Sequence, residues 1–482
     1  MTTTSDLIDA ATRGDDFLDA ARAILGERGL ITDADDIAPW LTDWRGRYHG
    51  KARALAQPAD TGELAVLVRL CSKHGVPLVA QGGNSGMVGG AVPDESGTAL
   101  LLSTRRMNQI TVDADAMTAT CGAGAILQIL HEAAEARDLR FPLSLGGKGS
   151  ATLGGLVSTN AGGTQVLRHG MMRALVAGLE VVLADGQVLD LTSHLIKDNR
   201  GFDLKQIFIG SEGTLGIVTK VVVRLSPAIA ERRVVIAGIE SAHSARDLLV
   251  FCQRAMPAAL EGFEIMPRPS VDAVLEHLPD ARDPLSESHP WYALMEFDAD
   301  RQGAALLGDE VENLLAQAFE EGLCDDAAIA ASEAQAEAFW QLRENIAPAE
   351  RARGPAMQHD ISVPVERMPD FIDAIEAAVL NRWPGHEVIA FGHLGDGNIH
   401  LHIIAPAGSD RVEWERDTGK SISAFVYARV TEWGGSISAE HGIGQDKLQT
   451  LRDTHDPAAL AVMAAVKRAL DPAGLLNPGK LV

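Results

Sequence analysis

The stretch PLSLGGKGSATLGGLVSTNAGG, Pro142–Gly163, is dense in glycine, serine and threonine. Glycine lets backbone N–H groups approach an anion closely, and hydroxyl and amide side chains add further hydrogen-bond donors. Two more stretches share this composition: QGGNSGMVGG (Gln81–Gly90), directly after the strand-like PLVA, and GSEGTLGIVT (Gly210–Thr219). One such cluster is most simply a turn, but three in one region predict a large phosphate-bearing ligand such as a dinucleotide.

Around these clusters the chain reads as two domains. From about residue 51 to 226, helical stretches such as Glu63–Gly75 alternate with short apolar strands, which is typical of an α/β domain. From about residue 230, longer amphipathic helices separate strands such as Tyr292–Ala299, which indicates an α+β domain with a mostly antiparallel sheet. We therefore predict four segments: a helical N-terminal segment, a ligand-binding domain, a second domain and a returning C-terminal segment, at 1–45, 46–227, 228–435 and 436–482.

One motif imitates a nucleotide-binding fingerprint. CGAGAILQI (Cys121–Ile129) has the order strand, Gly-x-Gly, helix. The third glycine is replaced by Leu127, and no acidic residue ends a following strand at the expected distance. We therefore predict that this motif only imitates a Rossmann fingerprint.

Composition excludes several classes of protein. The 482 residues carry a formal net charge of −24, which argues against nucleic acid or an anionic membrane surface as a partner. No apolar run is long enough to span a bilayer, and the first residues do not resemble a secretory signal. The four cysteines are scattered without a C-x-x-C pair, so an iron–sulfur cluster is not expected. We expect a cytoplasmic protein.

A second chemistry-bearing stretch is FGHLGDGNIHLHI, Phe391–Ile403. Asp396-Gly397 between two β-branched runs predicts a hairpin, with positive φ at both turn residues. The hairpin would bring His393 near His400, and His402 would share a strand face with His400. These imidazoles are either metal ligands or polar positions satisfied by hydrogen bonds.

Six ordered motifs give the chain a family resemblance: the three glycine clusters, FGHLGDGNIH, SAEHGIG (Ser438–Gly444) and LDPAGLLNPGK (Leu470–Lys480). Together they resemble the FAD-linked 2-hydroxy-acid dehydrogenases of the vanillyl-alcohol-oxidase superfamily, above all the D-2-hydroxyglutarate and D-lactate dehydrogenase branches. The resemblance implies an α+β protein in which a two-subdomain α/β domain binds FAD and the C-terminal segment returns to the flavin. Asn84 stands where covalently flavinylated relatives carry histidine, so the FAD is expected to be non-covalent. The implied FAD-binding residues are Gln81, Gly82, Gly83, Asn84, Ser85, Gly86, Gly146, Gly149, Ser150, Gly154, Gly155, Ser158, Thr159, Asn160, Gly162, Gly163, Glu212, Gly213, Gly216, Ile217 and Asn477.

The resemblance also implies a reaction. His393, His400 and Glu440 match the ligands of a divalent metal, with zinc as the expected ion, and His441 matches the catalytic base. An (R)-2-hydroxy acid can chelate such a metal through its hydroxyl and carboxylate groups. The base would accept the hydroxyl proton, and the α-hydrogen would leave as hydride.

Substrate recognition is implied for Arg343, Gln358 and His402. A guanidinium suits a carboxylate, although Arg343 could instead pair with Glu344 or Glu350 on the helix surface. The 2-hydroxyglutarate enzymes carry threonine, lysine and asparagine where this chain has Ala347, Gln358 and His402. The pocket is therefore expected to be less cationic away from the metal, which puts 2-hydroxyglutarate itself in question.

Two other readings stay open at this stage. One is a metal-independent flavin oxidase or dehydrogenase of an alcohol or aldonate, and the other is a non-catalytic flavoprotein subunit of a complex. For the leading reading, the expected partners are a small 2-hydroxy acid, an external electron acceptor (electron-transfer flavoprotein or a quinone) and a second copy of the chain in a homodimer.

Overall fold

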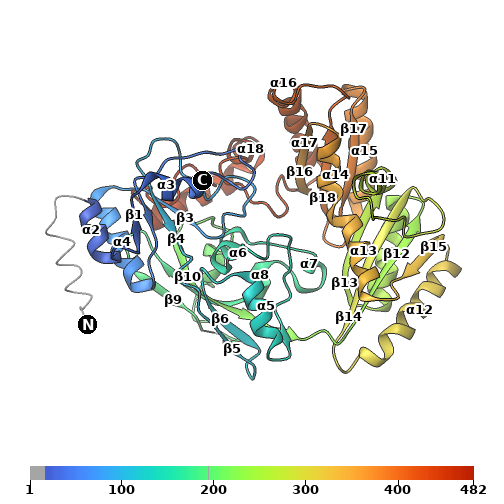
Figure 1. The fold of residues 1–482 in the computed structure, drawn as a ribbon, viewed down its shortest axis with the longest axis horizontal. Coiled ribbons are helices and arrows are strands. Elements are labelled where there is room, and N and C mark those ends of the chain that lie inside the picture. The colour runs from blue at the N-terminus through green and yellow to red at the C-terminus, as the bar shows by residue number, and fades with distance from the viewer. Residues whose placement is uncertain (1–16, 194) are drawn as a thin grey trace. The chain divides into compact units, whose positions relative to one another are not determined.

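A computed structural model describes residues 17–193 and 195–482 (Figure 1). The chain divides into two compact units. Besides its N-terminal part up to Gly163, the first unit contains His169–Pro227 and Glu440–Val482, and the second contains Thr164–Arg168 and Ala228–Ala439. Residues 1–16 of the predicted helical segment lie outside the described residues. The four-segment division stays a prediction.

The first unit contains two main sheets. One has the order β1-β2-β4-β3, with parallel pairing of β4 to both β2 and β3. The other has the order β5-β6-β10-β8-β9 and is antiparallel throughout. A short pair joins β7 to β11. The strands are β1 (Leu30–Ile31), β2 (Leu55–Ala56), β3 (Leu78–Gln81), β4 (Leu100–Ser103), β5 (Ile110–Asp113), β6 (Thr118–Gly122), β7 (Leu139–Arg140), β8 (Val176–Val182), β9 (Val188–Leu191), β10 (Ile217–Arg224) and β11 (Ser226–Pro227).

Helices of the first unit pack on these sheets and begin at recognisable caps. The side chain of Asp60 accepts the N–H of Glu63 at the start of α4, and Gly75 ends that helix with a φ of +64°. The helices are α2 (Phe17–Leu25), α3 (Ala34–Ile37), η1 (Ala38–Trp40), α4 (Thr61–His74), α5 (Leu127–Glu135), α6 (Leu153–Thr159), α8 (Met172–Leu175), α9 (Lys205–Phe208), α18 (Leu448–Thr454) and α19 (Pro457–Leu470). The short helix α7 (Val166–His169) belongs mainly to the second unit.

The imitation fingerprint lies in the antiparallel sheet. Strand β6 ends at Gly122, helix α5 begins at Leu127, and both neighbours of β6 run antiparallel to it. A Rossmann fingerprint needs a parallel βαβ unit. The prediction that this motif only imitates a Rossmann fingerprint is therefore confirmed.

The second unit is built on one antiparallel sheet with the order β15-β12-β14-β13-β17-β18-β16. Its central strands are buried on both faces, as the eight buried residues of β13 show. The predicted antiparallel sheet is confirmed. The strands are β12 (Glu231–Ile239), β13 (Leu260–Pro267), β14 (Trp291–Ala299), β15 (Asp326–Ile329), β16 (Ala356–Ser362), β17 (Glu387–His393) and β18 (Asn398–Ile404).

Separate hydrophobic cores cover the two faces of this sheet. One is formed with α10, α12, α15 and α17, and the other with α11, α13 and α14. Because Phe391 and Ile389 belong to the second of these cores, the α13–α14 side is the face that concerns the candidate site. The helices are α10 (Ala242–Ala255), α11 (Arg268–His277), α12 (Ala304–Glu320), α13 (Glu333–Glu344), α14 (Ile346–Arg353), η2 (Val365–Arg367), α15 (Met368–Arg382), α16 (Arg411–Trp414), η3 (Glu415–Gly419) and α17 (Lys420–Glu432).

All four cysteines are buried and none is in a disulfide. Burial raises the pKa of each thiol, to about 12 for Cys121 and Cys252 and to about 11 for Cys324. Among the described residues, no helix has both the length and the apolar character that crossing a membrane requires.

Candidate functional site

The hairpin of β17 and β18 places two histidines of β18 on one face of the sheet. His400 lies opposite Phe391, and His402 lies opposite Ile389. The connecting loop is Leu394–Gly397, so the hairpin prediction is confirmed but the expected two-residue turn is wrong. Gly397 has a φ of +81°, whereas Asp396 has a negative φ, and its carboxylate accepts the N–H of Asn398 at 3.0 Å.

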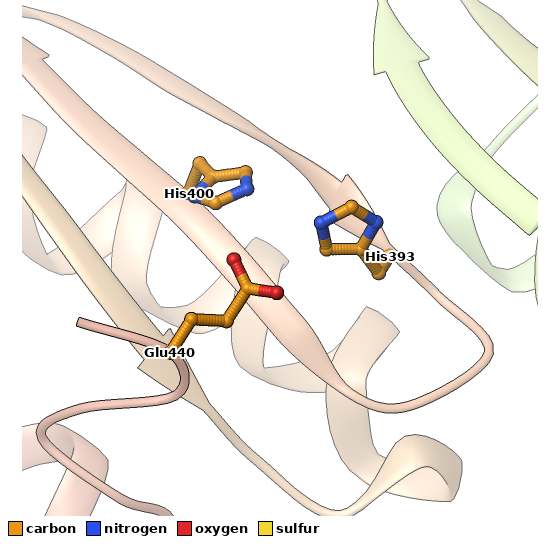
Figure 2. Close-up of side chains that lie close together, drawn as sticks. All are labelled: His393, His400 and Glu440. Carbon is orange, nitrogen blue, oxygen red and sulfur yellow. The ribbon is translucent and has the colours of Figure 1, made fainter. Parts of the chain in front are cut away.

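Ligand-type atoms of His393, His400 and Glu440 all lie within 4.8 Å of one another (Figure 2). Two imidazole nitrogens and a carboxylate oxygen are a donor set that suits zinc, which binds such ligands at about 2.0–2.2 Å. Three protein ligands leave further coordination positions for a substrate. The residues therefore fit a catalytic divalent metal.

The position of Glu440 follows from a strand-like contact four residues earlier. Ser436 exchanges two backbone hydrogen bonds with Ser362 at the end of β16, at 3.1 and 2.8 Å. From that anchor the chain reaches Glu440 after a short loop. The third ligand is thus brought to the hairpin by pairing to the same sheet that carries the two histidines.

A buried carboxylate, Glu264 of β13, supports the first histidine. Glu264 lies opposite His393, whose Nδ1–H donates to its Oε1, and Arg343 Nε donates to its Oε2 at 2.7 Å. Burial alone would raise the pKa of Glu264, but the charges of His393 and Arg343 outweigh it and lower the pKa to about 2. When His393 carries a single ring proton, an ionised carboxylate keeps that proton on Nδ1, so that Nε2 is the nitrogen that could bind a metal.

His400 is electrostatically suited to be a neutral ligand. Burial first, and then the positive charges of Arg343 and His393, hold its pKa well below the usual value. An imidazole must be unprotonated to bind a metal, so this environment favours the metal-binding form.

Arg343 lies beside the histidine hairpin, and its ion-pair partner differs from those that the sequence suggested. Neither of the predicted alternatives, Glu344 and Glu350, is the partner: the guanidinium pairs with Glu264 and stacks 4.8 Å above the ring centre of Phe391. This arrangement holds the guanidinium beside the metal ligands. The remaining N–H groups of its fork can bind a carboxylate.

His402 and Gln358 lie opposite each other on β18 and β16. His402 Nδ1 donates to Glu350 Oε2, and the Glu350 side chain is fully buried. Glu350 Oε1 and Gln358 Nε2 are buried without a hydrogen-bond partner among the described residues.

The glycine clusters of the first unit pack against one another. A Cβ on Gly83 would lie 1.9 Å from the carbonyl oxygen of Ser150, and one on Gly82 would lie 2.2 Å from Thr152 Oγ1. Only glycine permits this approach of the first cluster to the second. By contrast, Gly86, Gly146 and Gly149 face open space.

The third cluster joins the C-terminal segment through Glu212. Its carboxylate accepts the N–H groups of Ile443 and Gly444 at 2.8 and 2.7 Å, directly after the Glu440-His441 pair. Asn477 Nδ2 donates to the carbonyl oxygens of Glu212 and Gly90, at 2.7 and 3.0 Å.

Other residues that were predicted to bind the cofactor make hydrogen bonds or packing contacts within the protein. Ser158 and Thr159 donate to carbonyls of their own helix, and Asn160 ends that helix with positive φ and accepts the N–H of Arg173. A Cβ on Gly154, Gly163 or Gly216 would collide with Ala123, Ser144 or Val181, and Ile217 lies in a core. For these positions the structure shows a packing reason.

Comparison with known families settles the class of the chain. A model described as FAD linked oxidases, C-terminal domain, matches residues 229–481, more than half of the chain. A second, described as FAD binding domain, matches residues 52–192.

The chain belongs to the FAD-linked oxidase family.

Similar proteins within the family include curated dehydrogenases. The chain is 37% identical to the mitochondrial D-2-hydroxyglutarate dehydrogenase of Rattus norvegicus, covering 98% of this chain and 85% of that protein. It is 35% identical to the D-2-hydroxyglutarate dehydrogenase of Xanthomonas citri pv. viticola, covering 94% of both. The solved structure of p-cresol methylhydroxylase with substrate bound has a TM-score of 0.74 at 14% identity, covering 96% of both chains. The predicted vanillyl-alcohol-oxidase-type fold is confirmed.

The first unit fits the FAD of this family. Gly86, Gly146 and Gly149 each face open space, and the buried atoms Gln81 Oε1 and Thr152 Oγ1 have no partner among the described residues. The side-chain amide of Gln81 donates to the carbonyl oxygens of Trp40 and Ala91. Asn84, which has a φ of +54°, donates its side-chain N–H to the carbonyl oxygen of Thr42. Loops that are fixed by hydrogen bonds and still carry unpartnered polar atoms can bind a dinucleotide.

The sequence interpretation missed two residues of the site, Glu264 and Glu350. Glu264 had a signal, because an acid in the middle of the apolar strand EGFEIMP is costly to bury unless it is paired. Glu350 was considered only as a partner of Arg343, and nothing in its local sequence connects it to His402.

Proposed function

We propose that the protein is an FAD-dependent, divalent-metal-assisted dehydrogenase that oxidises an (R)-2-hydroxy acid to the 2-oxo acid. The observation that carries the proposal is the cluster of His393, His400 and Glu440, with His441 as the next residue. The family and its curated relatives named D-2-hydroxyglutarate dehydrogenase support the reaction class.

The residues have distinct tasks in this proposal. His393, His400 and Glu440 hold the metal, and Glu264 orients His393 through Nδ1. Arg343 binds the substrate carboxylate, and His441 accepts the hydroxyl proton at a ring nitrogen. When bound, FAD supplies the hydride acceptor and the metal supplies Lewis acidity. Gly442, with a φ of +81°, bends the backbone directly after the adjacent side chains Glu440 and His441.

Further parts of the proposal concern the surroundings of the enzyme. The FAD is non-covalent because Asn84 has no group that could attach it. Electrons pass to an external carrier, electron-transfer flavoprotein or a quinone, and the active form is a homodimer. Zinc is the proposed metal and the cytoplasm the proposed compartment, although the rat relative is named mitochondrial.

Substitution of the base and of the ligands tests the assignment. His441→Ala should keep FAD and metal but lose about two to four orders of magnitude in kcat, the usual contribution of a general base. His393→Ala and Glu440→Ala should instead lose the metal. The measurements are metal analysis of the purified proteins, the flavin spectrum, and flavin bleaching by (R)-2-hydroxy acids with a dye acceptor.

Chelation separates this proposal from a metal-independent flavin enzyme. Activity should disappear after dialysis against a chelator and return with Zn²⁺, while the flavin stays bound. Full activity of the metal-free protein, or wild-type metal content in both ligand variants, would show that the hairpin is not the metal site.

A further inference from the structure

A second buried imidazole–carboxylate pair lies on the same sheet face as the metal ligands. It consists of His402, whose side chain is 6% exposed, and Glu350 of helix α14, whose side chain is 0% exposed. His402 is two residues beyond His400 on β18, so the Cα atoms of the two residues lie about 7 Å apart along the strand.

The ring of Phe391 connects the two positions. Its centre lies 5.2 Å from that of His400 and 5.0 Å from that of His402. A 2-hydroxy acid held at the metal by its first two carbons would extend its remaining carbons over a distance of this size. The His402–Glu350 pair is therefore placed to meet the far end of the substrate.

Charged groups at this far end are already paired within the protein. The carboxylate of Glu350 is fully buried and pairs with His402, and the guanidinium of Arg343 pairs with Glu264. Opposite His402 stands Gln358, an uncharged amide. A second substrate carboxylate at this place would face Glu350 at low dielectric, where like charges repel strongly.

Two polar atoms at this far end, by contrast, have no hydrogen-bond partner in the described part of the chain. Glu350 Oε1 is an acceptor and Gln358 Nε2 is a donor, and both are buried without a partner among the described residues. Leaving such groups unmatched is costly, so a ligand that satisfies both gains affinity. A hydroxyl or a carboxamide can donate to the one and accept from the other.

We propose that Glu350 and Gln358 select an (R)-2-hydroxy acid whose far end is uncharged and hydrogen-bonding, and disfavour a second carboxylate. The inference rests on the proposed function and narrows its substrate class. Glu350 accepts a hydrogen bond from the far end of the substrate, Gln358 donates one to it, and His402 holds Glu350 in place.

An isosteric pair of substrates tests the charge directly. (R)-2-Hydroxyglutarate and its 5-carboxamide have the same length and differ at the far end only in charge. For the FAD- and metal-loaded full chain, kcat/KM should be at least about tenfold higher for the amide. Calorimetric binding of the two corresponding 2-oxo acids should show the same order without depending on turnover.

Variants then assign the selectivity to its residues. Glu350→Gln should bring the amide-to-carboxylate ratio close to one, because the repelling charge is gone. Gln358→Lys adds a cation opposite His402 and should move the preference toward the dicarboxylate. Glu344→Gln, the same change at an exposed residue of the preceding helix, is the matched control and should leave the ratio unchanged.

The outcomes distinguish failure of the selectivity proposal from failure of the proposed dehydrogenase function. If neither acid of the pair, nor lactate or malate, bleaches the flavin, the proposed function fails. If the flavin is bleached but the wild type prefers 2-hydroxyglutarate, or Glu350→Gln leaves the ratio unchanged, the selectivity proposal is overturned. Should Glu350→Gln not fold, Gln358→Lys decides alone, because an unaltered ratio in that variant also overturns the proposal.

Discussion

At the scale of single residues, buried charge organises the candidate site. Glu264 accepts hydrogen bonds from a metal-ligand candidate, His393, and from the substrate-binding candidate, Arg343. One carboxylate thus sets the orientation of two groups with different tasks. Because its two partners lie on β17 and α13, far away in the sequence, Glu264 couples them only in the folded protein.

Replacement of this carboxylate should weaken the metal site specifically. Glu264→Gln removes the charge that supports His393, and loss of such a partner typically costs about 10–100-fold in metal affinity. Competition with a chelator measures that affinity, and flavin content should stay at the wild-type level.

The matched control for this variant lies three residues earlier on the same strand. Glu261 is also buried and pairs with Arg168 at 3.0 Å, so Glu261→Gln disturbs a buried ion pair without touching His393. Equal metal loss in both variants would mean that damage to β13, and not the Glu264–His393 contact, is responsible.

At the scale of elements, the hairpin depends on one left-handed residue in a closed space. A Cβ on Gly397 would lie 2.2 Å from the carbonyl oxygen of Val363. The loop therefore tolerates no side chain there, and its length and shape set the register in which the strands carrying His393 and His400 pair.

Gly397→Ala should destabilise the protein and reduce metal binding together. Gly408, with a φ of +83° and nothing within 4 Å of a built Cβ, is the matched control for backbone strain alone. Gly408→Ala should cost about 1–2 kcal/mol in unfolding free energy, and Gly397→Ala about 1–3 kcal/mol more through overpacking. Denaturant titration and metal analysis measure the two effects, and equal costs for both glycines would contradict the role of the Val363 contact.

Local patterns predicted these elements well, and long-range partners poorly. The β-branched runs around Asp396-Gly397 were enough for the hairpin, since strand pairing there depends on neighbouring residues. The link from His393 to Glu264 spans 129 positions and arises only because β13 and β17 become neighbours in the sheet. The partner of His402 was missed for the same reason, because Glu350 reaches it from helix α14.

At the scale of the whole chain, the C-terminal segment is held in the first unit by a residue from the middle of the sequence. Glu212 accepts the N–H groups of Ile443 and Gly444, and burial raises its pKa although these two hydrogen bonds act to lower it. The carboxylate is thus an anchor whose ionisation costs stability.

The pH dependence of stability should reveal this cost. Because the folded pKa of Glu212 lies above the unfolded pKa, the native state keeps the proton in the window between them, and the free energy of unfolding falls as pH rises through that window. Glu212→Gln lacks this loss, so its stability relative to wild type should improve with rising pH from about pH 4.3 upward. Chemical denaturation at a series of pH values measures it.

A control at the surface sharpens that comparison. Glu135 is exposed at the end of α5, so Glu135→Gln should follow the wild-type curve at every pH. Parallel curves for wild type and Glu212→Gln across the acidic range would show that the folded protein does not disfavour ionisation of Glu212.

The burial of all four cysteines makes the molecule convenient for spectroscopic labelling. Maleimides react with the thiolate, and burial of these thiols disfavours both its formation and its access to reagents. Cysteines introduced at two exposed valines, Val188 in the first unit and Val412 in the second, would then be the sites that take up a pair of dyes or spin labels. Distances between such labels, recorded with and without a hydroxy acid, would show in solution whether the two units move when substrate binds.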